Sequence, residues 1–214
     1  MPLRAVIYDL DGTLVDSRAD LADSVNAMLE VLRLPPRQDE IIWSFIGEGA
    51  ERLVRRSLGP AHEDRFAEAM PIWRAEYARR LLVKTLPYPG IAGLLRLPPD
   101  ARGVLTNKPG GFAREILRGL GMPAAFRKVV GGDEPRRSPL PAGCSRCAAS
   151  SARSRARRCT WATARWTSRT GRAAGVRVCA VTWGLGEREA LAGADVILDR
   201  AEQVAGLLAS PWPG

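Results

Sequence analysis

The sequence feature that most restricts the fold is an apolar run that ends in two closely spaced carboxylates. Residues 3–8 form the run, Asp9 and Asp11 follow it, and Gly12 comes directly after them. Such a run predicts a buried strand, and alternate residues of an extended chain point to the same side, so the two aspartates can share one site. The glycine allows backbone N–H groups to turn toward a ligand. Two carboxylates at the end of a strand suit a hard cation together with a phosphate ester.

The length and the apolar pattern indicate a globular protein. A chain of 214 residues can bury a core in one or two domains. It has no apolar run long enough to span a bilayer, and it enters a strand at once, where a secreted protein would have a signal peptide. We therefore expect a cytoplasmic protein that has no membrane partner.

The net charge of +9 is concentrated in one segment. Residues 135–186 contain no Asp or Glu, and ten arginines lie between Arg136 and Arg172. Outside that stretch, 22 basic residues balance 23 acidic ones. A strongly basic chain by itself suggests a nucleic-acid partner, but here one segment accounts for the whole excess.

Residues 16–85 predict an all-helical module between two strand regions. Its first helix is expected over 18–33, with Ser17 as a suitable N-cap and apolar residues on one face. The last helix is expected over about 63–82, where Pro71 favours a kink or a break.

The stretch from Val6 to Ser17 resembles motif I of the haloacid dehalogenase (HAD) superfamily phosphatases, D-x-D-G-T-[LV]-x-D-S, and the match is nearly complete. The resemblance implies that Asp9 is the nucleophile, which forms an aspartyl-phosphate, and that Asp11 is the general acid and then the base. It also implies that the Asp9 side chain and the Asp11 backbone carbonyl hold Mg²⁺. The metal would neutralise the repulsion between two anions. The alternative is a strand end with two chance acids.

Residues 102–108 resemble motif II of the same superfamily, a strand followed by Ser or Thr. The resemblance implies that the Thr106 hydroxyl contacts a phosphate oxygen, with Asn107 behind it. Lys108 is more typical of a solvated loop lysine, and contact with the substrate is the open alternative.

The helical module resembles the cap that HAD phosphatases insert after motif I. The turn around Gly47 and the return at 85–90 are similar to the phosphoglycolate phosphatase branch, although Gly47 also suits an ordinary turn between helices. The resemblance implies an α/β fold, in which residues 1–15 and 86–214 form a HAD-like Rossmannoid core with a parallel sheet. Residues 16–85 would form the inserted all-helical cap, whose closure excludes water from the site.

The family pattern fails over residues 138–169. Motif III would place a Lys that stabilises the phosphoaspartate where Ser138 stands, and motif IV would add Mg²⁺-binding aspartates that the segment lacks. We expect this segment to be irregular, without a strand, which would leave sheet backbone unpaired and destabilise the fold. The pattern resumes at Thr170, with strands expected over 176–181 and 194–198.

A frameshifted reading of an intact gene explains this failure. The last base of the Trp166 codon and the first two bases of the Thr167 codon give GAC, an Asp codon. With codons that end in G or C elsewhere, residues 160–167 read Val-Gly-Asp-Gly-Pro-Val-Asp in that frame, which matches motif IV. In the same shifted frame, the codons of residues 137–139 can encode Lys-Pro. On this hypothesis the basic charge is an artefact and the enzyme is inactive or nearly so.

We therefore predict a Mg²⁺-dependent phosphatase of a small phosphomonoester such as 2-phosphoglycolate, with no nucleic-acid partner. Three alternatives stay open. The first is an Arg-rich nucleic-acid binder on an inactive core, and the second is a sugar-phosphate mutase of the same superfamily. The third is a zinc site at Cys144, Cys147 and Cys159, whose fourth ligand would have to be Cys179, a residue that fits a core position. Neither the exact substrate nor the oligomeric state follows from the sequence.

Overall fold

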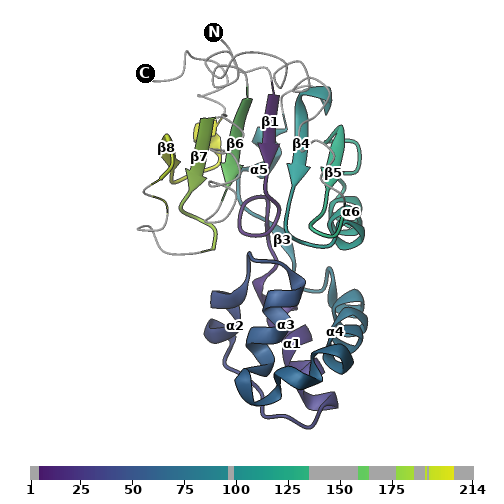
Figure 1. Ribbon diagram of the computed structural model, residues 1–214. Coiled ribbons are helices and arrows are strands. Elements are labelled where there is room, and N and C mark those ends of the chain that lie inside the picture. The colour runs from purple at the N-terminus through teal and green to yellow at the C-terminus, as the bar shows by residue number, and fades with distance from the viewer. Residues whose placement is uncertain are drawn as a thin grey trace.

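The molecule combines a parallel sheet with a bundle of helices that packs at one edge of it (Figure 1). The computed structural model describes residues 5–95, 99–134, 159–163, 177–185, 191 and 193–204. In that part of the chain, no helix combines the length and the apolar character that crossing a membrane requires.

The main sheet has six strands in the order β5-β4-β1-β6-β7-β8, and all neighbouring strands are parallel. Its strands are β1 (Ala5–Tyr8), β4 (Arg102–Leu105), β5 (Lys128–Val130), β6 (Cys159–Thr163), β7 (Arg177–Val181) and β8 (Val196–Leu198). β1 lies in the interior, and Tyr8 is opposite Val104 on one side and Ala162 on the other. This position explains why its sequence is apolar on both faces.

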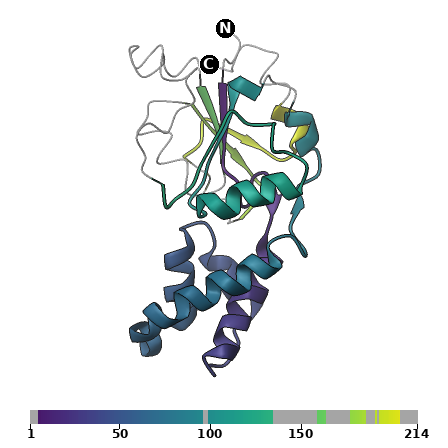
Figure 2. The same cartoon turned by 90° about the vertical axis from the view of Figure 1, so that its right-hand side faces the viewer.

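Along the chain, three short helical segments connect strands of the main sheet in this part of the structure. They are α5 (Ile91–Leu94), η2 (Pro99–Ala101) and α6 (Gly110–Gly119). α6 crosses one face of the sheet (Figure 2) and buries Ala113, Ile116 and Leu117. The prediction of a strand within 102–108 and of strands near 176–181 and 194–198 is confirmed in type and order.

The bundle lies between two short strands, β2 (Val15–Asp16) and β3 (Leu86–Pro87), which pair antiparallel where the chain enters and leaves it. Its helices are α1 (Arg18–Val31), α2 (Asp39–Phe45), α3 (Ala50–Leu58), η1 (Pro60–Arg65) and α4 (Phe66–Arg80). The predicted first helix is confirmed. Of the two alternatives predicted at Pro71, a kink or a break, the break is wrong, because α4 continues through this residue. Proline removes one backbone donor, while Trp73 and Tyr77 in the next turns stack on each other and are buried.

Strand β6 corrects the expectation that residues 138–169 contain no strand. It pairs in parallel with β1 on one side and with β7 on the other. The expectation was wrong because it looked for large aliphatic side chains, whereas Thr and Trp also favour extended backbone. β1 therefore has a partner on each side, which removes the reason to expect a destabilised sheet. The rest of 138–169 lies outside the described residues.

A buried carboxylate ties the two connections of the bundle together. Asp20, in the first turn of α1, is fully buried. Its oxygens accept hydrogen bonds from the backbone N–H of Lys84 at 2.9 and 3.0 Å, and from the N–H and hydroxyl of Thr85 at 2.7 and 2.6 Å. Because residues 84–85 lead into β3, this cluster fixes the exit of the bundle to its entrance.

We expect Asp20→Ala to lower the free energy of unfolding by about 3 kcal/mol, because it leaves several buried donors without an acceptor. Asp23→Ala is the matched control. Asp23 is on the same helix and contacts Lys84 through an exposed ion pair of 2.7 Å, so its loss should change stability by less than about 1 kcal/mol. Urea unfolding measures both, and equal effects would contradict the role of Asp20.

Candidate active site

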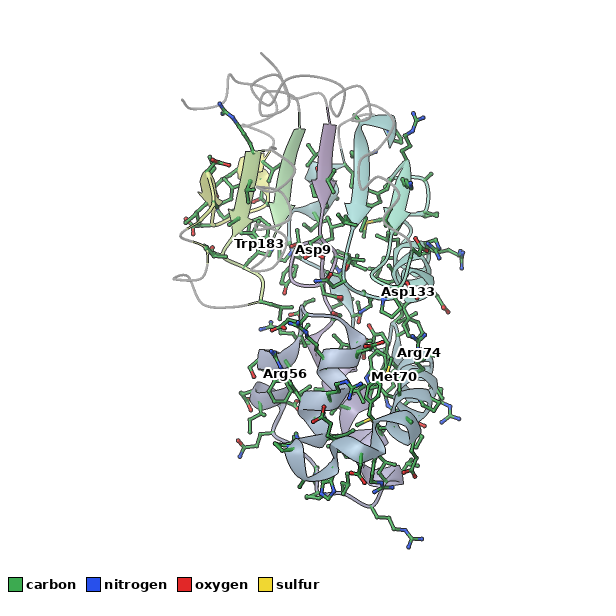
Figure 3. The ribbon with its side chains drawn as sticks, in the orientation of Figure 1. Asp9, Arg56, Met70, Arg74, Asp133 and Trp183 are labelled. Carbon is green, nitrogen blue, oxygen red and sulfur yellow. The ribbon has the colours of Figure 1, made fainter. Side chains whose placement is uncertain are left out.

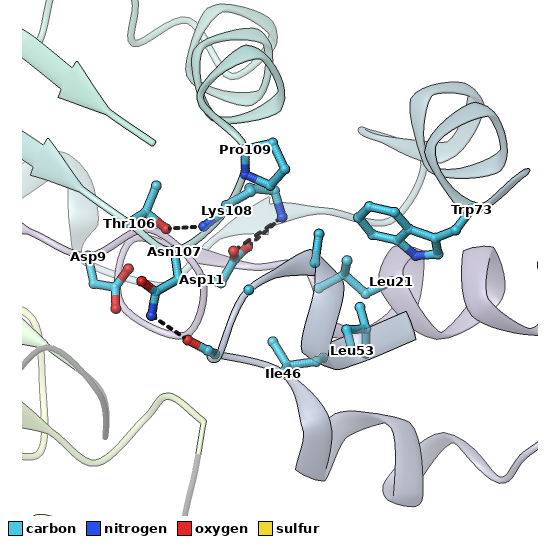
Figure 4. Close-up of a pocket in the computed structure, with 13 residues that line it drawn as sticks. Asp9, Asp11, Leu21, Ile46, Leu53, Trp73, Thr106, Asn107, Lys108 and Pro109 are labelled. Carbon is cyan, nitrogen blue, oxygen red and sulfur yellow. Dashed lines mark hydrogen bonds and ion pairs between the residues drawn. The ribbon is translucent and has the colours of Figure 1, made fainter. Parts of the chain in front are cut away.

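The carboxyl ends of β1 and β4 meet the bundle at one pocket. Asp9, Asp11, Thr106 and Asn107, the four residues that the sequence predicts, all line it. Figure 3 places Asp9 at the junction between sheet and bundle, and Figure 4 shows the pocket itself. The ends of neighbouring parallel strands meet at the same edge of a sheet, which is why residues almost a hundred positions apart come together here.

Asp9 is held in a tight turn at the end of β1. The side chain is 9% exposed, and its Oδ1 accepts a hydrogen bond of 2.7 Å from the backbone N–H of Leu10. Gly12 has a positive φ of 72°, and a Cβ there would lie 2.7 Å from the Leu185 side chain. The indole N–H of Trp183, after β7, donates to the Thr13 carbonyl at 3.2 Å. The turn therefore requires glycine and is braced from the β7 side.

Asp11 forms a buried ion pair with Lys108. The ammonium lies 2.9 Å from Oδ1 and 3.2 Å from Oδ2, and the Ser17 hydroxyl donates to Oδ1 at 2.5 Å. Ser17 precedes α1 as its N-cap, but its side chain makes no capping bond. This hydroxyl therefore serves the site, a role that the sequence analysis did not predict.

The expectation of a solvated Lys108 is wrong, because the residue is only 5% exposed. Its ammonium also lies 4.6 Å from the centre of the Tyr77 ring, on α4. Burial lowers the pKa of Lys108, but the Asp11 carboxylate and Tyr77 raise it by more, so the net pKa is above its usual value and the group stays charged. A signal was available, since Thr106 and Lys108 have the same alternate spacing after a strand as Asp9 and Asp11.

The loop after β4 joins the sheet to the bundle. The Thr106 hydroxyl accepts a hydrogen bond of 3.2 Å from the backbone N–H of Lys108. The Asn107 amide donates to the Gly47 carbonyl at 2.8 Å, so this side chain holds the turn between α2 and α3 against the pocket. Thr106 is 2% exposed.

The pocket is small and has two different walls. The sheet side supplies the charged and polar groups, and the bundle supplies apolar side chains (Figure 4). The apolar side chains of the bundle that line the pocket are Leu21, Ile46, Leu53 and Trp73.

The oxygen atoms after β1 suit part of a Mg²⁺ site. Mg²⁺ is usually held by one or two carboxylates together with water and substrate phosphate. Asp9 and Asp11 fit that description, and both line the pocket. Within the described residues no three Asp, Glu, His or Cys side chains cluster as metal ligands, and residues 135–186 contain no carboxylate that could add one. The donor set therefore suits a weakly held ion that relies on oxygens of the substrate.

The zinc alternative loses its fourth ligand. Cys179 is buried in the core, as the sequence predicts, and burial together with the charge of Asp195 raises the pKa of its thiol to about 12. Zinc binds the thiolate form, which this environment disfavours. Cys144, Cys147 and the side chain of Cys159 lie outside the part of the chain that the structure describes.

We expect Gly132→Ala to lower the free energy of unfolding by about 1–3 kcal/mol, because its Cβ would lie 2.4 Å from the Asn107 carbonyl oxygen. The backbone of the loop after β4 would have to move, and phosphate binding should weaken with it. Gly111→Ala is the control, since a Cβ on that helical residue meets nothing within 4 Å. It should stabilise the protein by about 0.5–1 kcal/mol. Equal stability of the two variants in urea unfolding would contradict this account of the loop.

Comparison with known proteins gives the same family for sequence and fold. A family model described as haloacid dehalogenase-like hydrolase matches residues 6–181. The phosphoglycolate phosphatase of Nitrosospira multiformis is 39% identical over 150 residues, which cover 66% of this chain and 66% of the relative. The phosphoglycolate phosphatase of Chromobacterium violaceum is 40% identical over 153 residues, which cover 65% of this chain and 68% of the relative. The chain thus spans about two thirds of the length of these relatives.

Solved structures agree in architecture. A predicted phosphoglycolate phosphatase from Haemophilus somnus has a TM-score of 0.81 and 25% identity, with 96% of this chain and 97% of that chain covered. A haloacid dehalogenase-like family hydrolase from Streptococcus pneumoniae has a TM-score of 0.78 over 95% of this chain and 97% of that chain, and its 23% identity shows the fold alone. The predicted α/β fold is confirmed, and the chain belongs to the haloacid dehalogenase-like hydrolase family.

Proposed function

We propose that this chain carries the active site of a phosphatase for a small phosphomonoester such as 2-phosphoglycolate. The observation that carries the proposal is the meeting of Asp9, Asp11 and Thr106 at one small pocket. The names of the relatives, which are phosphoglycolate phosphatases, support the substrate class. Asp9 is the nucleophile, and Asp11 is the general acid and then the base.

The proposed reaction moves one phosphoryl group twice. An Asp9 carboxylate oxygen attacks phosphorus while the bond to the ester oxygen breaks, and Asp11 gives a proton to that departing oxygen. Asp11 then takes a proton from a water molecule whose oxygen attacks the phosphorus of phospho-Asp9. Inorganic phosphate leaves, and the Asp9 carboxylate is restored. The covalent route replaces one difficult step by two easier ones.

Neighbouring groups support each role. The Thr106 hydroxyl lies in the pocket to contact a phosphate oxygen, and Ser17 and Lys108 hold the Asp11 carboxyl from two directions. Bound Mg²⁺ would neutralise part of the charge that accumulates when a phosphate dianion approaches Asp9.

We further propose that residues 16–85 act as a cap over a core formed by 1–15 and 86–214. The bundle covers the pocket with apolar side chains, and Asn107 and Lys108 of the core contact Gly47 and Tyr77 of the bundle. Such a cover would exclude water while Asp9 is phosphorylated, which strengthens the electrostatic interactions inside the site.

The frameshift hypothesis gains support from two directions. The relatives match 65–66% of this chain, whereas the fold of the Haemophilus protein matches 96% of it. The register of the sheet also fits, because Ala162 is opposite Tyr8 in the parallel β1–β6 pair. In the shifted frame the first Asp codon straddles Ala162 and Thr163, so its carboxylate would lie at the same sheet edge as Asp9. We propose that this carboxylate completes the Mg²⁺ site in the intact protein.

A frame-corrected chain should release phosphate from 2-phosphoglycolate at least about 1,000-fold faster than the present chain. It regains a metal carboxylate and a Lys beside the phosphate, and each such group typically contributes a factor of about 100–1,000. Colorimetric phosphate release in the presence of Mg²⁺ measures the ratio. Equal rates would contradict the frameshift hypothesis, and release from neither 2-phosphoglycolate nor hexose phosphates would contradict the phosphatase assignment. Salt-dependent binding of DNA that is lost when residues 138–169 are deleted would favour the nucleic-acid alternative.

Asp9→Asn in the frame-corrected chain should abolish phosphate release, because an amide cannot replace the carboxylate as nucleophile. The control is Asp64→Asn, on the exposed surface of η1, which should leave the rate unchanged. Retention of most of the activity in Asp9→Asn would contradict the proposed role of Asp9.

A further inference from the structure

The pocket of the described residues contains one side-chain cation, Lys108. This lysine is buried, and its position is fixed by the two oxygens of Asp11 and by the face of the Tyr77 ring. An ammonium group can donate three hydrogen bonds, and Asp11 accepts two. A ligand oxygen can therefore join this contact without removing the counter-ion of Asp11.

The other polar groups of the pocket have different tasks. Asp9 and Thr106 are assigned to the phosphoryl group, and the Asn107 amide is bonded to Gly47. The wall that faces the remainder of a substrate is apolar, with Leu53 and Trp73 among its residues. Sugar hydroxyls would lose their hydrogen bonds with water against that wall, which costs binding free energy.

The spacing along the chain restricts the shape of the ligand. Lys108 is two residues after Thr106, and its backbone N–H donates to the Thr106 hydroxyl. A group that contacts Lys108 while the phosphate contacts Thr106 must lie close to that phosphate in the same molecule.

We propose that Lys108 is a specificity-determining residue, which selects short phosphomonoesters with a carboxylate on the carbon that bears the ester oxygen. This inference rests on the proposed function, because it takes the position of the phosphate from Thr106 and Asp9. It identifies the Lys108 ammonium as the group by which the protein distinguishes such a substrate from a sugar phosphate or a simple alkyl phosphate.

The test compares two ligands of nearly equal size. 2-Phosphoglycolate has a carboxylate where ethyl phosphate has a methyl group. Any difference between their affinities therefore comes from the contacts that the protein makes with that carboxylate. Isothermal titration calorimetry with the present chain in Mg²⁺ buffer measures both affinities without requiring turnover. We expect 2-phosphoglycolate to bind about 10- to 100-fold more tightly, the range for a hydrogen bond to a charged group.

Lys108→Gln should reduce that preference to less than about threefold while ethyl phosphate still binds. Lys108→Arg keeps the charge and should keep most of the preference. If Lys108→Gln does not fold, the comparison of the two esters on the unaltered chain still tests the proposal. Lys84→Gln removes an exposed lysine that pairs with Asp23 and should leave the preference unchanged.

The outcomes separate the two levels of the argument. If both esters bind the unaltered chain equally, or if the preference survives in Lys108→Gln, the role of Lys108 is overturned and the phosphate site stands. If inorganic phosphate, ethyl phosphate and 2-phosphoglycolate bind neither the present chain nor the frame-corrected Asp9→Asn chain, the proposed function itself is overturned.

Discussion

The buried ion pair between Asp11 and Lys108 is the interaction on which the site depends. It joins segments that are 97 residues apart in the chain, one after β1 and one after β4. The Lys108 side chain is 3% exposed and that of Asp11 12%, so removing Asp11 would leave the ammonium buried without its counter-ion. The pair therefore joins the two strand ends, where Asp9 and Thr106 line the same pocket.

The same region also connects the sheet with the bundle. Lys108 contacts the Tyr77 ring, and Asn107 bonds the turn at Gly47, while Asp20 secures the chain where it returns to the sheet. The bundle is thus held both at its connection and across the pocket. The pocket residues after β4 and the bundle share these contacts, so a change in the loop after β4 affects both.

The limits of sequence-based prediction follow from which interactions are local. The alternation of Asp9 and Asp11 after an apolar strand is local, and it was enough to predict their shared site. The burial of Lys108 depends on α4, which is inserted far away in the sequence, so the loop itself looked solvated. β6 was missed for a related reason, because its pairing comes from the strands on either side and its own side chains give a weak signal. Its neighbours in 138–169 have a composition that no family pattern explains.

We propose that an intact phosphatase sequence is interrupted by a shifted reading frame over residues 138–169. The most direct test is the nucleotide sequence of the gene across codons 135–170. The account predicts two compensating single-base errors near the ends of this stretch, whose correction restores a Lys-Pro at 137–139 and two aspartates, one at 162–163 at the end of β6 and one at 166–167. A confirmed reading without such errors would contradict it, and the basic segment would then be a true part of the protein.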